Sequence, residues 1–152
     1  MRNSKVLILC IIIYFFSDSV SAQKAITIES VQGTLDFGTF WTQSGGDITI
    51  NSTGEKPIID FGIIHLIQPN PTPVSIFITA SANKDIYISE TINNPADCIL
   101  TVNYDKPDPF LFANNANTAM EVRVGATLTV PASPLPGPRN GSITVEFTYN
   151  YQ

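Results

Sequence analysis

The sequence predicts an all-β fold, an immunoglobulin-like or pilin-like antiparallel β-sandwich of about eight strands. Apolar side chains recur with a period of two along most of the chain, and helical spacing does not persist beyond about one turn. Short runs rich in Thr, Ile and Val are separated by turns rich in Gly, Pro, Asn and Ser. Such punctuation is typical of a sandwich or a barrel, and we favour the sandwich.

The amino-terminal residues 1–22 have the pattern of a secretory signal peptide. Two basic residues precede an apolar run from Val6 to Phe16, and a polar stretch then leads to Ala22. This order predicts cleavage between Ala22 and Gln23. The apolar run is shorter than the roughly 20 residues of a membrane-spanning helix, so we expect no transmembrane segment after processing. Residues 23–152 are then a single β-sandwich domain, exported to the periplasm, the cell surface or the extracellular space.

The charge of the chain argues against nucleic acid as a partner. The formal net charge is −5, and it becomes −6 when Arg2, Lys5 and Asp18 leave with the signal. A chain this acidic has no basic stripe with which to neutralise phosphates. Cys98 is the one cysteine left after processing, and its place at the start of an apolar run predicts a buried, unreactive side chain.

The candidate strands share alternating or continuous apolar character between turn-forming residues. They run from Ala25 to Val31, Asp47 to Asn51, Ile58 to Ile67, Val74 to Ala80, Asp85 to Glu90, Cys98 to Tyr104, Met120 to Val130 and Ser142 to Tyr151. The last of these has the clearest alternation, because Ile143, Val145 and Phe147 are each followed by a polar or charged residue. Such a strand turns one face to the core and the other to water.

Three motifs carry a family resemblance: Leu35 to Gly38, Val124 to Val130, and Gly137 to Gly141 ahead of the last strand. In this order and spacing they resemble the exported bacterial family known as domain of unknown function 4402 (DUF4402), whose members are similar to pilin and spore-coat sandwich proteins. The resemblance implies architecture and export, and it implies no activity. By analogy with the subunits of bacterial surface fibres, one strand of the sandwich could be supplied by a neighbour.

The sequence predicts no catalytic, cofactor-binding or metal site. His65 is the sole histidine, within an apolar strand, so a metal site built on several imidazoles is excluded. Asp105 and Asp108 lie in one loop but lack the alternating ligand spacing of calcium loops. No glycine-rich phosphate loop stands between a strand and a helix. We therefore expect a protein that is not an enzyme and has no cofactor.

Two sets of aromatic side chains are candidate contacts with a ligand or partner. Trp41 could stack on a sugar ring or pack in the sandwich core. Phe110 and Phe112 belong to an apolar triplet between a proline and an asparagine-rich run. We place this triplet on a loop, as a plug over one end of the sandwich or as an exposed contact patch.

The segment from Gln23 to Val31 is a candidate for strand exchange. Ile26 and Ile28 alternate with polar or small residues, so the segment could be the first strand of its own sandwich or fill the groove of a neighbour. The number of residues before Leu35 favours the internal role. The resulting functional hypothesis is a surface-structure or adhesin-like, fimbrial-type component that associates with itself or with other exported surface proteins. The alternative is an extracellular or periplasmic module that binds a glycan or another ligand.

Overall fold

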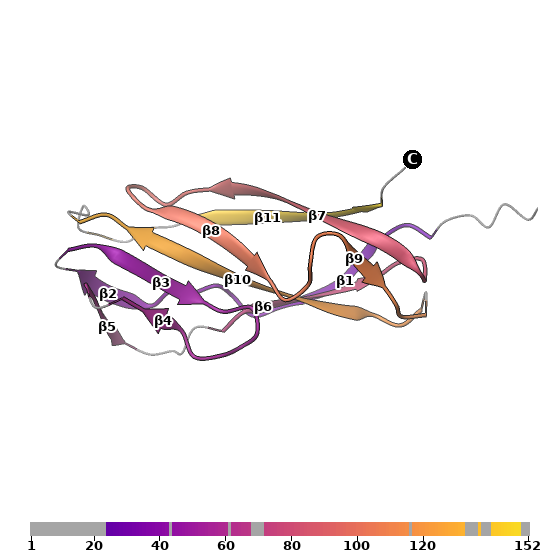
Figure 1. Ribbon diagram of the computed structural model, residues 1–152, viewed down its shortest axis with the longest axis horizontal. Helices are drawn as coiled ribbons and strands as arrows, with labels where there is room; N and C mark the ends of the chain where they lie inside the picture. The colour runs from indigo at the N-terminus through magenta and orange to yellow at the C-terminus, as the bar shows by residue number, and fades with distance from the viewer. Residues whose placement is uncertain are drawn as a thin grey trace, which may run out of the picture.

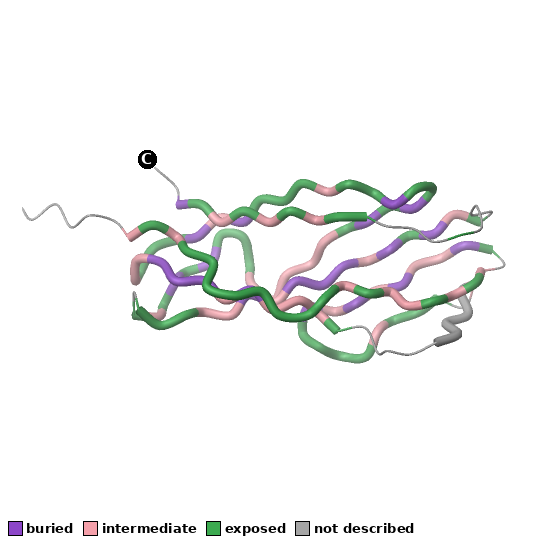
Figure 2. The backbone as a smooth tube through the Cα atoms, turned by 180° about the vertical axis from the view of Figure 1, so that it is seen from behind, coloured by how far each residue is buried: buried purple, intermediate pink, exposed green. Residues whose placement is uncertain are grey.

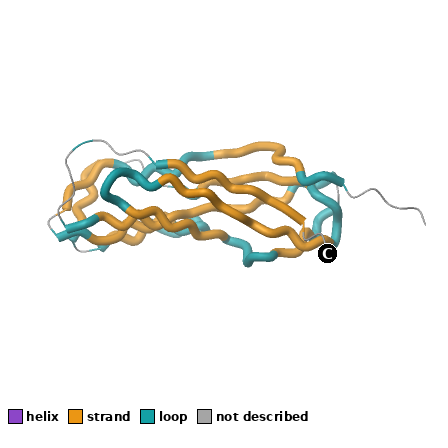
Figure 3. The backbone as a smooth tube through the Cα atoms, turned by 90° about the horizontal axis from the view of Figure 1, so that it is seen from above, coloured by secondary structure: helices purple, strands orange, loops and turns teal. Residues whose placement is uncertain are grey.

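The computed structural model of the chain describes residues 24–42, 44–60, 62–67, 72–115, 117–132, 137 and 141–149, with the backbone alone described for 63–67. All regular structure in these ranges is β, and the strands run close to the long axis of the molecule (Figures 1 and 3). In chain order they are β1 (Thr27–Gln32), β2 (Thr39–Thr42), β3 (Gly46–Ile50), β4 (Ile58–Ile59), β5 (Ile63–Ile67), β6 (Val74–Thr79), β7 (Lys84–Asn93), β8 (Ile99–Tyr104), β9 (Phe110–Phe112), β10 (Met120–Val130) and β11 (Ser142–Tyr149). Within the described ranges no helix is long and apolar enough to span a bilayer.

Two antiparallel sheets form the sandwich. The first has the order β1-β6-β10-β3-β4, with β8 paired to the other edge of β10. The second has the order β11-β7-β9. A separate ribbon of β2 and β5 lies at one end of the molecule (Figure 1). The predicted all-β sandwich is confirmed.

The strand order is that of an immunoglobulin sandwich in which one edge strand is missing. An immunoglobulin domain packs a sheet of strands A, B, E and D against a sheet of C, F and G. Here β1, β6, β10 and β8 correspond to A, B, E and D, while β7 and β11 correspond to C and F. Among the strands that the structure describes, none takes the place of G beside β11.

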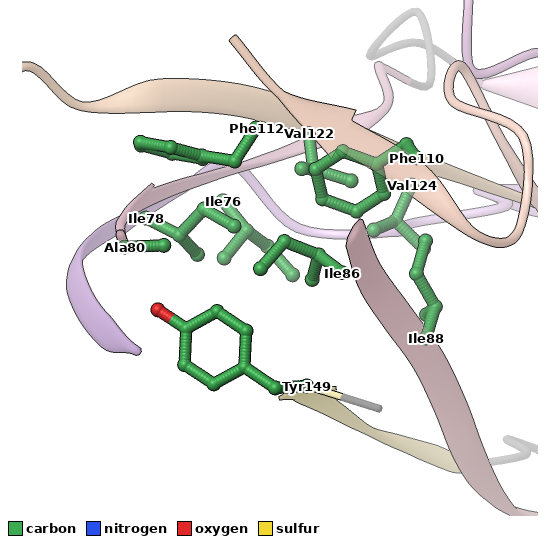
Figure 4. Packing of buried hydrophobic residues seen from close by; sticks show 10 residues of the cluster. All are labelled: Ile76, Ile78, Ala80, Ile86, Ile88, Phe110, Phe112, Val122, Val124 and Tyr149. Carbon is green, nitrogen blue, oxygen red and sulfur yellow. The ribbon is translucent and has the colours of Figure 1, made fainter. Parts of the chain in front are cut away.

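The core has two clusters that share β10. The first joins the start of β10 and β6 to β7, β9 and β11 of the facing sheet, and Figure 4 shows its side chains meeting between the sheets. The second joins the end of β10 to β3 and β8. Cys98 belongs to the second cluster and is 4% exposed, as expected of a small hydrophobic residue.

Gly125 marks the point where β10 changes partners. Before it β10 pairs with β6, and after it with β3. The side chain of Asn103 lies beside this point, where it accepts a hydrogen bond from Ser52 N at 2.9 Å and donates one to the Ile50 carbonyl at 3.3 Å. A Cβ on Gly125 would collide with that carbonyl and with Asn103 Oδ1. Glycine is therefore required here by close packing.

The single strand predicted from Ile58 to Ile67 is wrong, because the structure divides it into β4, paired with β3, and β5, paired with β2. The division follows Asp60, whose N–H donates to the Asp47 carbonyl at 3.0 Å. Gly62 then lies so close to the Gly45 backbone that a Cβ would not fit. The chain turns at this contact, and the apolar composition of the segment gives no sign of it.

The other differences between the predicted and the observed strands concern short strands. The sequence pattern predicts no strand at Thr39–Thr42, where the structure has β2. It assigned Phe110 and its neighbours to a loop, whereas they form β9 and pair with β7. A run of three or four residues is too short for a period of two to be recognised. Asn150 and Tyr151, the end of the last predicted strand, lie outside the described residues.

Candidate functional site

Within the residues that the structure describes, no strand pairs with the outer edge of β11, and its core-facing side chains are incompletely covered. Directly opposed residues of an antiparallel pair point to the same face, and Phe147 and Tyr149 oppose Ile88 and Ile86 of β7. Ile86 and Ile88 are 0% and 7% exposed. Phe147 packs against the same cluster but stays half-buried, as does Val145. β9 pairs with β7 only as far as Ile86, and within the described residues no strand pairs with the outer edge of β11.

In the facing sheet, strand β1 likewise has core-facing side chains that are incompletely covered. It pairs with β6 of its own chain, and Ile28 and Val31 oppose Ile78 and Ile76. Those two β6 residues are buried. Ile28 and Val31 are 50% and 59% exposed although the register turns them to the core side. Every residue of β1 is exposed, and Figure 2 shows the strand as one continuous exposed segment.

Strands β1 and β11 are held together at one end by Tyr149. Its hydroxyl donates to the Lys24 carbonyl at 2.7 Å and accepts from Ser81 N at 2.7 Å. The ring is buried in the first cluster, and Figure 4 shows it below Ile86 with its hydroxyl group directed away from β11. A buried tyrosine hydroxyl needs such partners. We call this set of hydrogen bonds the Tyr149 clasp.

A cavity of about 1080 Å³ opens at the other end of β11. Its walls include Leu35 and Phe37 from the segment after β1, Leu100 and Leu128 from the second cluster, and Ile143 at the start of β11. Between this cavity and the Tyr149 clasp no main-chain pairing joins β1 and β11. We call this gap, with Ile28 and Val31 on one wall and Ile143, Val145 and Phe147 on the other, the open seam.

Three carboxylates belong to the strands beside the open seam. Glu29 is on β1 and accepts a hydrogen bond from Thr79 Oγ1 at 2.7 Å. Glu90 opposes Val145 in the β7 and β11 register and accepts from the Tyr104 hydroxyl at 3.1 Å. Glu146 is exposed on β11. Burial, together with the nearby Glu90 carboxylate, raises the pKa of Tyr104, so this hydroxyl stays a donor at neutral pH.

A family model described as a domain of unknown function, DUF4402, matches residues 26–149. The chain belongs to the DUF4402 family. This match confirms the family that the sequence motifs indicate. It spans both walls of the open seam and ends at Tyr149, so the DUF4402 domain contains the whole feature apart from Lys24. No curated protein and no solved structure matches the chain.

The DUF4402 domain does not bring the predicted contact residues together. Trp41 is 42% exposed on β2, so its predicted place in the core is wrong. Phe110 and Phe112 are 3% and 0% exposed in the first cluster, at the end of the molecule away from β2 (Figure 1). Their interpretation as an exposed patch is wrong, because the pleat of β9 turns both rings inward and leaves Leu111 outside.

The strand-exchange candidates lie on the open seam, in the internal role. Ile26 is half-buried against the first cluster, and Ile28 is on β1. The expected cleavage site at Ala22 and Gln23 lies outside the described residues, as does the side chain of His65. Within the described residues no group of three His, Cys, Asp or Glu side chains could hold a metal ion.

The sequence did not single out Ile143, Val145 and Phe147 as a functional set. Their alternation was recognised, but alternation shows which face a side chain occupies and does not show whether a neighbouring strand covers it. The sequence carries no signal for such a set, because the covering of a strand edge depends on which strands lie beside it in the fold.

Proposed function

We propose that this DUF4402 domain is an exported bacterial surface protein without catalytic activity, which acts by association with other proteins. Its role would be that of a surface-layer or fimbrial-type component or an adhesin-like module. The observation that carries the proposal is the open seam. Unpaired strand edges and contiguous exposed apolar side chains mark surfaces that pair with another polypeptide.

The seam supports association because it combines two incomplete interactions in one place. From Ser142 to Thr148, a length of about 24 Å, the outer edge of β11 pairs with none of the described strands. Behind that edge lie the half-buried Ile143, Val145 and Phe147, and the exposed Ile28 and Val31 form the other wall. A partner could satisfy the edge and cover the apolar rows at once.

Site-specific crosslinking in the producing cells tests the proposal. A photoreactive amino acid at Thr144, exposed on β11, should give adducts with another polypeptide. The same amino acid at Thr129, exposed on the central strand β10, is the matched control and should give none. Equal adducts from the two positions, or none from Thr144, would refute association through this edge.

A second candidate function rests on Trp41. Its exposed indole on β2 could stack on a sugar ring, which would make the domain a carbohydrate-binding module. Size-exclusion chromatography and a glycan array distinguish the two functions. A strictly monomeric protein that binds glycans, and loses them in Trp41→Ala, would replace association with glycan binding.

A further inference from the structure

We propose that the open seam binds one extended segment of a separate protein, with aliphatic side chains at alternate positions and no carboxylates. This inference rests on the proposed function and specifies the partner's chemistry. The geometry points to a strand, because from Ser142 to Thr148 the outer edge of β11 pairs with none of the described strands, and only another extended backbone can pair with it along that length.

The spacing of the partner's apolar residues follows from the walls of the seam. Ile143, Val145 and Phe147 repeat every second residue, and all three are half-buried. A strand paired with β11 would turn alternate side chains into the same gap, towards Ile28 and Val31 on β1. Those side chains would complete the first cluster, and the intervening ones would face water.

The cavity at the start of β11 extends the recognition site. Apolar side chains of Leu35, Phe37 and Ile143 line it, and it is continuous with the second cluster through Leu100 and Leu128. At the opposite end the Tyr149 clasp closes the gap between the first and last strands. The bound segment is therefore bounded at the clasp, and a larger apolar side chain fits at its far end.

Charge decides between the possible partners. Glu90 shares the face of Val145, and Glu146 lies on the outer face of β11, while Glu29 lies on β1 and accepts from Thr79. A carboxylate on either face of a strand paired with β11 would therefore lie near a like charge and be repelled. A second copy of this chain is disfavoured, because its own candidate segment, β1, carries Glu29 and would have to leave β6. A neutral or basic segment from another protein fits the seam without either cost.

Synthetic peptides test the inference. The probe is Lys-Thr-Val-Thr-Ile-Thr-Val-Thr-Lys, and a rearranged peptide, Lys-Thr-Thr-Thr-Thr-Val-Val-Ile-Lys, has the same composition without alternation. We expect the alternating peptide to bind at least ten-fold more tightly and to slow hydrogen exchange of the β11 amides. A third peptide, with both valines of the probe replaced by glutamate, should bind at least ten-fold more weakly than the probe. Equal affinity for all three peptides would overturn the inference.

Two reciprocal variants locate the binding. Val145→Thr keeps the shape of a half-buried seam residue but adds a hydroxyl, and should weaken binding at least five-fold. Thr144→Val makes the opposite change on the exposed face and should leave binding unchanged. Hydrogen exchange of the unaltered domain also locates the binding, because the bound peptide should protect the β11 amides. Protection confined to the outer edges of β4, β8 or β9 would overturn the inference.

The remaining outcomes separate the partner from the proposed function. A peptide of residues 24–31 that binds better than the probe, or concentration-dependent dimers abolished by Val145→Thr, would show that the occupant is a second copy and overturn the choice of partner. Crosslinks from Thr144 without binding of the alternating peptide would refute the binding of an extended segment but would still support association with another protein. Alternation-specific binding without crosslinks in cells would support the strand and refute the proposed function.

Discussion

We expect the hydrogen bonds of the Tyr149 clasp to stabilise the sandwich where the segment before β1 meets the end of β11. Tyr149→Phe keeps the buried ring and removes the hydroxyl that serves Ser81 N and the Lys24 carbonyl. A buried polar group left without a partner costs about 1–3 kcal/mol. The Lys24 carbonyl keeps a longer hydrogen bond from Ser81 Oγ at 3.4 Å, and both residues are half-buried and reach water in part, so we expect a loss of about 1–2 kcal/mol. That corresponds to a fall in Tm of roughly 3–8 °C for a domain of this size.

Tyr104→Phe is the matched control for this variant. It makes the same chemical change at a hydroxyl whose partner, the exposed Glu90 carboxylate, remains hydrated, so the expected loss is below about 1 kcal/mol. Urea denaturation gives the two free energies, and hydrogen exchange should show faster opening of β1 in Tyr149→Phe alone. Equal losses in the two variants, or unchanged exchange in β1, would refute the role of the clasp.

Three further predictions concern packing, pH and processing. Gly125→Ala should destabilise the domain by more than about 3 kcal/mol or prevent folding, because its Cβ would meet backbone at the partner switch of β10; a thermal melt close to that of the unaltered domain would disprove this. Hydrogen bonds from Arg123 and Ser75 lower the pKa of Glu121 below its ordinary 4.5, so this contribution is present above that pH and lost as the pH falls through the lower folded value. Glu121→Gln should therefore be slightly less stable near pH 7, and a difference that persists at pH 2 would contradict this origin. Mass spectrometry of the native protein should find Gln23 at the amino terminus, whereas an intact Met1 would refute export by a cleaved signal.

The fold class could be predicted from local pattern, because alternation is written in the residues themselves. Ile143, Val145 and Phe147 show a strand with two unlike faces, and the structure places them on β11. Which strands pair with each other depends on residues far apart in the sequence, so it could not be predicted from local alternation. Nothing near Gly125 in the sequence indicates that β10 leaves β6 for β3 at that residue, since the cause is the approach of Asn103 and Ile50 from other parts of the chain.

The residues of the candidate site could be predicted from the sequence less well than the fold. Trp41 and Phe112 are both aromatic residues in short apolar runs, yet one is exposed on a ribbon and the other is fully buried. Their difference depends on which strands lie opposite them. The open seam depends on which of the described strands lie beside β11, and a side chain such as Val145 has the same sequence context whether or not a strand pairs with that edge.

The Tyr149 clasp also has a consequence for the order of folding. Its hydrogen bond joins residues that are 125 positions apart in the chain. Closing a loop of that length is slow and must await synthesis of the last strand. Before β11 is synthesised, β1 can pair with β6, but Tyr149 is not yet there to tie Lys24 and Ser81 to the other sheet, and β7 lacks the partner that it has along Ser142–Tyr149. The sandwich can therefore close only after β11 has been made.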